Sequence, residues 1–207
     1  LLHELGVWSL LQSSRITPIN TMQVWESSGT AYVRWNDEKI DPLGFIVENN
    51  HLQAAIHERL DQQGIVTKKV PSKIRELKTD QASFAHISLE DNSSLSARLV
   101  IGCEGAQSFV KKSLKIPTWG WSVNQFGIVC SVETNQPSHT AWQRFIDSGP
   151  IALLPCWGNY SSIVWSCDRD LHKFLLELED DKFVAELNYH LTKRSRHDTL
   201  NVSLGSP

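Results

Sequence analysis

The segment Leu99–Lys112, LVIGCEGAQSFVKK, decides how this chain is expected to fold. An apolar strand runs into an acid-glycine turn, and a helix start follows. In an open α/β sheet, a ligand usually binds beyond the carboxyl ends of the strands. Gly105 permits a positive φ, and the first turn of the following helix offers unpaired N–H groups. The segment therefore predicts a nucleotide-binding turn, with a purely structural junction as the alternative.

The charged side chains of this turn indicate which part of a nucleotide could bind there. Glu104 would repel a bare phosphate, whereas its carboxylate is a suitable acceptor for sugar hydroxyls. Lys111 supplies a cation about two helical turns further on. A ribose or the edge of a flavin therefore fits the turn better than an isolated phosphate does.

Composition excludes several classes of function. The chain has 207 residues, 41% of them hydrophobic, and a formal net charge of -3. This suits one or two globular domains. The sequence contains no sustained basic run of the kind that binds nucleic acid, and no apolar stretch approaches the ~20 residues of a membrane span.

Cysteine and histidine spacing argues against a metal site. The four cysteines form no Cys-x-x-Cys pair, and they are expected to be buried free thiols: Cys103, Cys130, Cys156 and Cys167. His51 and His57 are six positions apart, whereas zinc ligands on one helical face usually stand four apart. No metal is expected.

Hydrophobic periodicity predicts mixed elements in the first half of the chain. A helix is expected at the start, with Leu1, Leu5, Trp8 and Leu11 on one face. Alternation predicts a hairpin from two strands, Met22–Glu26 and Ala31–Trp35. A helical stripe follows at Asn49–Gln62, where Asn49 or Asn50 caps the first turn. Three further strands are expected: Ile65–Val70, Ser83–Leu89 and Leu95–Ile101.

The second half of the chain predicts an antiparallel sheet. A helix near Ala106–Leu114 precedes four closely spaced strands: Phe126–Val132, Thr140–Ile146, Ile151–Leu154 and Ser161–Cys167. A closing amphipathic helix is expected at Asp181–Leu191. The whole is a mixed α/β (α+β) chain. Residues 192–207 lose apolar periodicity and are expected to form a polar tail or a truncated end.

The segment Ile101–Lys111 resembles the Asp-Gly motif of flavin-dependent aromatic hydroxylases, G-A/C-D-G-x-x-S-x-V-R. Ser108 stands at the place of the motif serine, Glu104 replaces the usual Asp, and Lys111 replaces the usual Arg. Both substitutions keep the charge and change the reach, and lysine lacks the guanidinium fork. The resemblance implies that Glu104, Gly105, Ser108 and Lys111 contact FAD.

Four further segments make the resemblance more specific, to one group of flavin-dependent hydroxylases. LGFIVEN, AWQRF, GPIALLP and SSIVWS begin at Leu43, Ala141, Gly149 and Ser161. In this order they resemble the ubiquinone-biosynthesis hydroxylases, particularly the mitochondrial ring monooxygenases of coenzyme Q synthesis. The similarity runs from about Leu1 to Leu191.

The resemblance implies a fold like that of para-hydroxybenzoate hydroxylase, in which the chain passes twice between two domains. Residues 1–20 and 49–117 are then parts of the FAD-binding domain, and residues 21–48 and 118–191 are parts of the substrate domain. The G-x-G-x-x-G and Gly-Asp motifs of this family are absent from the sequence. The chain is therefore expected to be a fragment that binds FAD weakly by itself.

The chemistry that the resemblance implies belongs to the cofactor. Reduced flavin reacts with O2 to give a C4a-hydroperoxide, which hydroxylates a polyprenylated hydroxybenzoate-type ring. Electrons are expected from a ferredoxin and its reductase. Other coenzyme Q biosynthesis proteins are expected as partners, at the matrix side of the mitochondrial inner membrane through peripheral contact, and nucleic acid is not. The alternative is a truncated, non-catalytic scaffold or prenyl-lipid-binding member of the same complex.

Two more site residues follow from the resemblance. Asn49 stands where a Gln touches the flavin in para-hydroxybenzoate hydroxylases, and the competing interpretation is a simple helix cap. Arg144, in the pair Gln143-Arg144, stands where an arginine binds the substrate carboxylate. The competing interpretation of Arg144 is a surface ion pair. Trp142, Phe145, Trp157 and Trp165 are candidates for an aromatic lining, and for each of them singly an ordinary position in the sheet core is the favoured interpretation.

Overall fold

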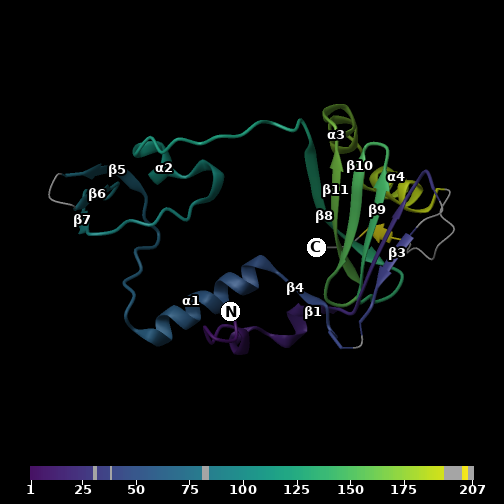
Figure 1. Cartoon of the computed structure of the whole chain (residues 1–207), viewed down its shortest axis with the longest axis horizontal. Helices are drawn as coiled ribbons and strands as arrows, with labels where there is room; N and C mark the ends of the chain where they lie inside the picture. The colour runs from purple at the N-terminus through teal and green to yellow at the C-terminus, as the bar shows by residue number, and fades with distance from the viewer. Residues whose placement is uncertain (30–31, 38, 81–83, 194–201, 205–207) are drawn as a thin grey trace. The chain divides into compact units, whose positions relative to one another are not determined.

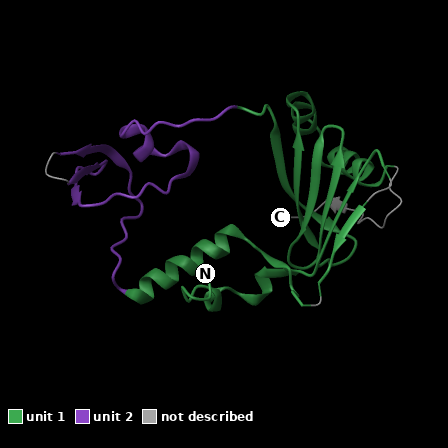
Figure 2. Ribbon diagram, in the orientation of Figure 1, with its two compact units in different colours: residues 1–63, 122–207 green, residues 64–121 purple. Residues whose placement is uncertain are grey.

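The computed structural model describes residues 1–29, 32–37, 39–80, 84–193 and 202–204 (Figure 1). These residues form a mixed α/β chain, as the sequence predicts. The chain divides into two compact units, one of residues 1–63 and 122–207 and the other of residues 64–121 (Figure 2). The division rests on compactness, so the predicted assignment of segments to a flavin part and a substrate part stays a prediction.

The larger unit is built on a seven-stranded sheet with the order β12-β8-β11-β10-β9-β2-β3. All neighbouring strands are antiparallel except β2 and β9, which run parallel. The strands are β2 (Thr21–Glu26), β3 (Tyr32–Trp35), β8 (Phe126–Thr134), β9 (Thr140–Ile146), β10 (Gly149–Pro155), β11 (Tyr160–Cys167) and β12 (Val202–Leu204).

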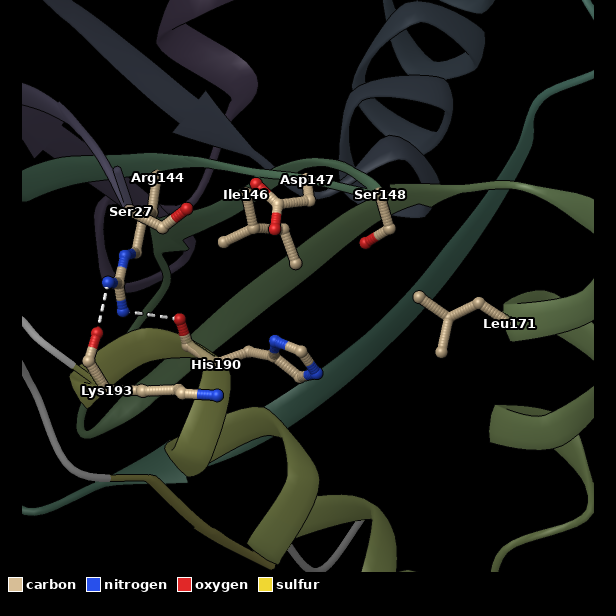
Figure 3. A pocket seen from close by; sticks show the side chains of 8 residues that line it. All are labelled: Ser27, Arg144, Ile146, Asp147, Ser148, Leu171, His190 and Lys193. Atoms are coloured by element: carbon tan, nitrogen blue, oxygen red, sulfur yellow. Dashed lines mark hydrogen bonds between the residues drawn. The ribbon is translucent and has the colours of Figure 1, made fainter. Parts of the chain in front are cut away.

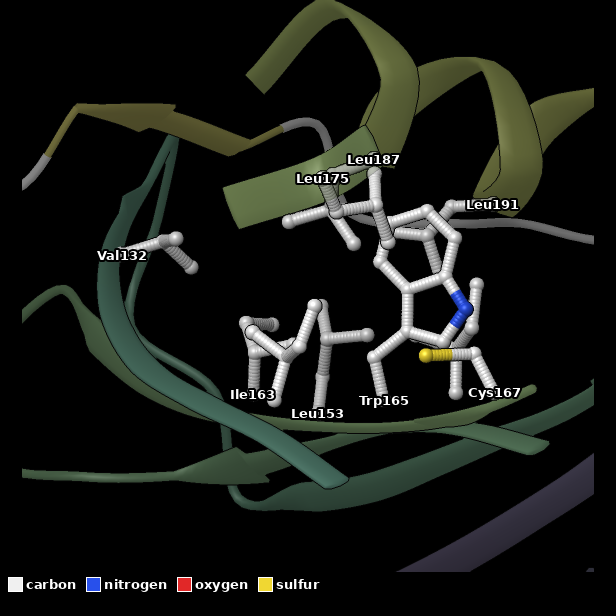
Figure 4. Close-up of a cluster of buried hydrophobic side chains, with 10 residues drawn as sticks. Val132, Leu153, Ile163, Trp165, Cys167, Leu175, Leu187 and Leu191 are labelled. Carbon is white, nitrogen blue, oxygen red and sulfur yellow. The ribbon is translucent and has the colours of Figure 1, made fainter. Parts of the chain in front are cut away.

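One face of this sheet carries the main core. Alternate residues of β10 and β11 are fully buried, and the register pairs Ile151 with Trp165 and Leu153 with Ile163. Helices α3 (Arg169–Leu176) and α4 (Asp180–Thr192) cover this face with Leu175, Leu187 and Leu191 (Figure 4). Period-two alternation in the strands and an apolar stripe on the helices therefore meet in one layer of side chains.

The hairpin between β9 and β10 depends on a glycine. Gly149 has φ +136°, and a Cβ atom there would lie 2.4 Å from the carbonyl oxygen of Ser166 on β11. Glycine is the residue that combines this backbone conformation with so close an approach of a neighbouring strand.

The N-terminal part of the larger unit contains a two-stranded ribbon and a long helix. Strands β1 (Ile16–Ile19) and β4 (Gly44–Val47) pair antiparallel, and helix α1 (Asn49–Gln63) begins directly after β4. Two short 3-10 helices, η1 (Trp8–Leu10) and η2 (Ser13–Arg15), precede the ribbon.

The smaller unit has its own sheet and core. Strands β5 (Ile74–Thr79), β6 (Ala85–Leu89) and β7 (Ser94–Ala97) form an antiparallel meander. The 3-10 helix η3 (Gly105–Gln107) and the short helix α2 (Phe109–Ser113) follow. Leu77, Ala85 and Val110 are buried together.

Most predicted elements of the larger unit are confirmed. Helix α1, the hairpin of β2 and β3, the four antiparallel strands and the closing helix lie within one or two residues of the predicted bounds. Residues 30–31 and 81–83, which include the predicted first residues of two strands, lie outside the described residues. Helix α3 was not predicted.

Four predictions are wrong. The first eleven residues form turns and η1, because Gly6, with φ +70°, turns the chain after its first turn. Neither Ile65–Val70 nor Leu99–Ile101 is a strand, and Leu99 and Ile101 are 74% and 73% exposed. Cys103 is exposed rather than buried. Apart from these four, Val202–Leu204 forms the edge strand β12, and the interpretation of residues 192–207 as a polar tail or truncated end stays a prediction.

Candidate functional site

The predicted nucleotide-binding turn forms a compact loop in the smaller unit. Gly105 has φ +76° and begins η3, and Ser108 caps helix α2 by accepting a hydrogen bond from the N–H of Lys111. No atom lies within 4 Å of the position that a Cβ of Gly105 would occupy. A side chain at this position would therefore meet open space, and the predicted binding of a nucleotide at the turn stays a prediction.

The Glu104 carboxylate already has two internal donors. Its Oε2 atom accepts hydrogen bonds from Ser108 Oγ at 2.7 Å and from the N–H of Val110 at 3.1 Å. The Ser108 bond first, and then the Val110 N–H, lower the pKa of Glu104 below its usual value. Oε2 therefore stabilises the turn.

Lys111 folds back onto the turn. Its Nζ atom donates to the carbonyl oxygen of Ala106 at 2.8 Å. The ammonium group therefore lies beside η3. Glu104, Gly105, Ser108 and Lys111 therefore lie together in one turn, and their contact with FAD stays a prediction.

Asn49 lies in the other unit. It is the first residue of α1 and is exposed. The preceding residue, Glu48, accepts hydrogen bonds through its main-chain oxygen from the N–H groups of His51 and Leu52, both at 3.0 Å. Glu48 therefore occupies the N-cap position of α1. The role of Asn49 as a flavin contact stays a prediction.

Arg144 lies on the helix-covered face of the large sheet. It is 1% exposed, and its guanidinium donates to the carbonyl oxygen of His190 at 2.6 Å and to that of Lys193 (Figure 3). These oxygens belong to the C-terminal end of α4, where a cation is favourable. The structure therefore gives Arg144 a helix-capping role, and its predicted contact with a substrate carboxylate stays untested.

A cavity of about 410 Å³ lies beside Arg144. It is lined by Ser27, Arg144, Ile146, Asp147, Ser148, Leu171, His190 and Lys193 (Figure 3). Burial lowers the pKa of His190 below its usual value, an effect that Glu186 partly opposes. Arg144 Nε and Ser148 Oγ are buried and have no hydrogen-bond partner among the described residues.

The opposite face of the sheet offers an apolar surface that the site prediction missed. Because adjacent residues of a strand point to opposite faces, Gln143 and Phe145 lie on this face. Phe145 is 47% exposed. Strand pairing places one row of side chains across the face: Val24, Gln143, Ala152, Val164 and Val129. The alternation Trp142, Arg144, Ile146 was the sequence signal that could have separated the two faces.

The four aromatic candidates lie in different parts of the larger unit. Trp165 is completely buried in the main core, and Trp142 packs against it. Trp157 is partly exposed in the turn between β10 and β11, where the guanidinium of Arg15 lies over its ring. Of the four, Phe145 alone belongs to the open sheet face.

Among the described residues, no group of three or more His, Cys, Asp and Glu side chains could hold a metal ion. None of the helices in those ranges combines the length and apolar character needed to cross a bilayer.

Known proteins are similar to this chain in sequence. The sequence model of a family described as "FAD binding domain" matches residues 6–205. Proteins named "Ubiquinone biosynthesis monooxygenase COQ6, mitochondrial" match from Danio rerio, with 30% identity over all of this chain and 45% of the relative, and from Homo sapiens, with 31% identity over 91% of this chain and 42% of the relative. The chain thus spans less than half the length of these relatives.

Solved structures agree on the fold. PqsL, a probable FAD-dependent monooxygenase from Pseudomonas aeruginosa, superposes with a TM-score of 0.73 at 17% identity, over 92% of this chain and 53% of the other. HpxO from Klebsiella pneumoniae, complexed with FAD and uric acid, superposes with a TM-score of 0.64 at 16% identity, over 91% of this chain and 49% of the other. At these identities the likeness concerns the fold alone.

Proposed function

The chain belongs to the FAD-binding domain family, and we propose that it forms part of an FAD-dependent aromatic-ring monooxygenase of ubiquinone biosynthesis. The observation that carries this proposal is the similarity, at 30% identity and over the full chain, to ubiquinone biosynthesis monooxygenases. The proposed substrate is a polyprenylated hydroxybenzoate-type ring, and O2 is the co-substrate. Because the chain covers 45% of that relative, activity is assigned to the complete protein.

The turn at Glu104 fits a flavin nucleotide. Its open side at Gly105, the Glu104 carboxylate and the Lys111 ammonium would contact the cofactor, and Ser108 would keep the turn in shape. Asn49, at the start of α1, is a separate proposed flavin contact, which follows from the family resemblance. When bound, FAD supplies the redox and oxygen-transfer chemistry. The residues of this chain bind and orient it.

The open face of the large sheet suits the proposed substrate. Its row of small apolar side chains offers a surface for an aromatic ring or a prenyl chain, and Gln143 is a single polar group within that row. Such a surface would orient the ring and exclude water. The buried position of Arg144 favours this face over the cavity beside α4 as the substrate surface.

The proposed setting is mitochondrial, because the relatives are named so. We include in the proposal a ferredoxin and its reductase as electron donors, other coenzyme Q biosynthesis proteins as partners, and peripheral contact with the matrix side of the inner membrane. These follow from the family resemblance.

The proposal is tested on the complete protein that contains this chain. Purified after expression, it is expected to show the visible absorption of bound flavin and to hydroxylate a prenylated hydroxybenzoate in the presence of a reducing system. The control is the same protein with Gly105→Val, in which a β-branched side chain occupies the open side of the turn at a positive φ. A wild-type protein without flavin absorption and without product would overturn the proposal.

A further inference from the structure

We infer that Arg15 is a positioning residue that holds the first turn of α1 against the large sheet, and so sets the place from which Asn49 meets the flavin. The inference rests on the proposed function. It assigns a role to a residue that lies outside every motif of the sequence.

Arg15 and Glu48 flank the β1–β4 ribbon. Ile16 pairs with Val47, so the residue before β1 and the residue after β4 face each other across the ribbon. Arg15 Nη1 lies 2.9 Å from Glu48 Oε1. Because Glu48 also caps α1 through its main-chain oxygen, the ion pair acts directly on the start of that helix.

The same guanidinium reaches the large sheet. Arg15 Cζ lies 4.3 Å from the ring centroid of Trp157, in the turn between β10 and β11. Trp157 in turn packs against Tyr160, the first residue of β11, with ring centroids 4.9 Å apart. One side chain therefore connects the α1 N-terminus to two strands of the sheet.

Arginine is the residue type that makes both contacts together. Its planar, delocalised cation stacks on an indole face while its N–H groups donate in the plane of the guanidinium. A lysine ammonium is a compact charge and does not present a stacking plane. Arg15→Lys is therefore expected to retain the ion pair and weaken the contact with Trp157.

Exposure decides what these contacts contribute. The side chains of Arg15 and Glu48 are 37% and 40% exposed. Ion pairs that are so accessible to water contribute little to the free energy of unfolding. Their effect is instead to restrict orientation, and small displacements of a contacting group lower affinity strongly in preorganised sites.

The chain provides a matched control on the same helix. Arg59 Nε donates to the carbonyl oxygen of Leu5 at 2.8 Å, so it also ties α1 to a distant segment. Arg59 lies ten residues beyond Asn49, about 15 Å along the helix. Arg59→Met removes an arginine contact of α1 without touching its first turn.

The experiment compares Arg15→Met, Arg15→Lys, Arg59→Met and wild type in the complete protein. Two measurements need no flavin. The first is amide hydrogen exchange at residues 49–52. The second is acrylamide quenching of Trp157 fluorescence, in a protein whose other exposed tryptophans, Trp35, Trp119 and Trp121, are replaced by Phe. The third is the FAD dissociation constant, from titration of the apoprotein well below its melting temperature. We expect Arg15→Met to speed exchange, increase quenching and raise the dissociation constant at least about tenfold. The values for Arg15→Lys should lie between those of wild type and Arg15→Met. Arg59→Met should match wild type in all three measurements.

Each outcome is decisive. Unchanged exchange and quenching in Arg15→Met would show that the connection does not hold α1, and would overturn the inference. Changed exchange with an unchanged dissociation constant would reduce Arg15 to a structural role and also overturn it. A wild-type protein that binds no FAD would overturn the proposed function, and the role toward flavin with it, while the two flavin-free measurements would still report whether Arg15 holds the helix.

Discussion

The Glu104 carboxylate shows how a single side chain serves both the fold and a site. Sequence patterning predicted it to be an acceptor for a ligand. In the structure one of its oxygens accepts hydrogen bonds from Ser108 Oγ and from the Val110 N–H, so part of its acceptor capacity is internal. A glutamate in place of the usual aspartate has the reach for this, because its longer side chain spans the turn.

The lowered pKa of Glu104 predicts a pH dependence. A carboxyl group whose pKa is lower in the folded state than in the unfolded chain stabilises the fold above its ordinary pKa of 4.5, and this contribution is lost as the pH falls through the folded value. Chemical denaturation of the smaller unit, followed by Trp119 and Trp121 fluorescence, is expected to show this loss in wild type. In Glu104→Gln the stability near neutral pH should be lower and the acid-side slope smaller. An equal slope in both proteins would contradict the assignment.

Arg144 is predicted to stabilise the folded state. Arg144→Met removes two charge-assisted hydrogen bonds to the end of α4 and leaves the His190 and Lys193 carbonyl groups without this donor. The free energy of unfolding should fall by about 3 kcal/mol. The measurement is urea denaturation of the complete protein, with Arg169→Met, at an exposed position of α3, as the control. A normal stability combined with a raised KM for a carboxylated substrate would instead support the predicted clamp.

At the scale of elements, the tightest constraint lies in the β9–β10 hairpin. Gly149→Ala places a methyl group 2.4 Å from the Ser166 carbonyl oxygen at φ +136°. Overpacking and backbone strain together should cost about 3 kcal/mol of unfolding free energy. Gly127→Ala in β8 is the comparison, since a Cβ atom there meets nothing within 4 Å, and it should change stability much less. Thermal unfolding followed by circular dichroism distinguishes the two variants.

Strand formation depended on partners as well as on pattern. The four strands β8 to β11, each of which has an antiparallel neighbour among the four, were predicted to within two residues. Ile65–Val70 and Leu99–Ile101 have similar apolar content, yet no described strand pairs with either. An extended segment without a hydrogen-bonding neighbour does not form a ladder, whatever its side chains. Strand β5, which contains Arg75, Glu76 and Lys78 among its six residues, was missed for the converse reason: it forms because β6 supplies its partner.

At the scale of the whole chain, each unit has a core of its own. The main core gathers Trp165, Leu187 and Leu191, whereas the smaller unit buries Leu77, Ala85 and Val110. Leu187→Ala should lower the stability of the larger unit by about 3 kcal/mol, since Leu187 is completely buried. Hydrogen exchange should then speed up in β10 and β11 and stay unchanged in β6. Faster exchange in β6 would show that the two cores unfold together.

The amino-acid sequence by itself determined the mixed α/β class, the acid-glycine turn at Glu104 and Gly105, and most elements of the larger unit. These features depend on local periodicity, turn chemistry and motif spacing, which can be read from residues close together in the sequence. The tertiary structure alone decided which face of the sheet each side chain occupies and which polar groups are already satisfied. In the tertiary structure, Arg144 points toward α4, and one oxygen of Glu104 accepts hydrogen bonds within its own turn. Arg15, Glu48 and Trp157 lie in contact. Such contacts join segments far apart in sequence, and their geometry follows from strand pairing and helix packing, which no local pattern records.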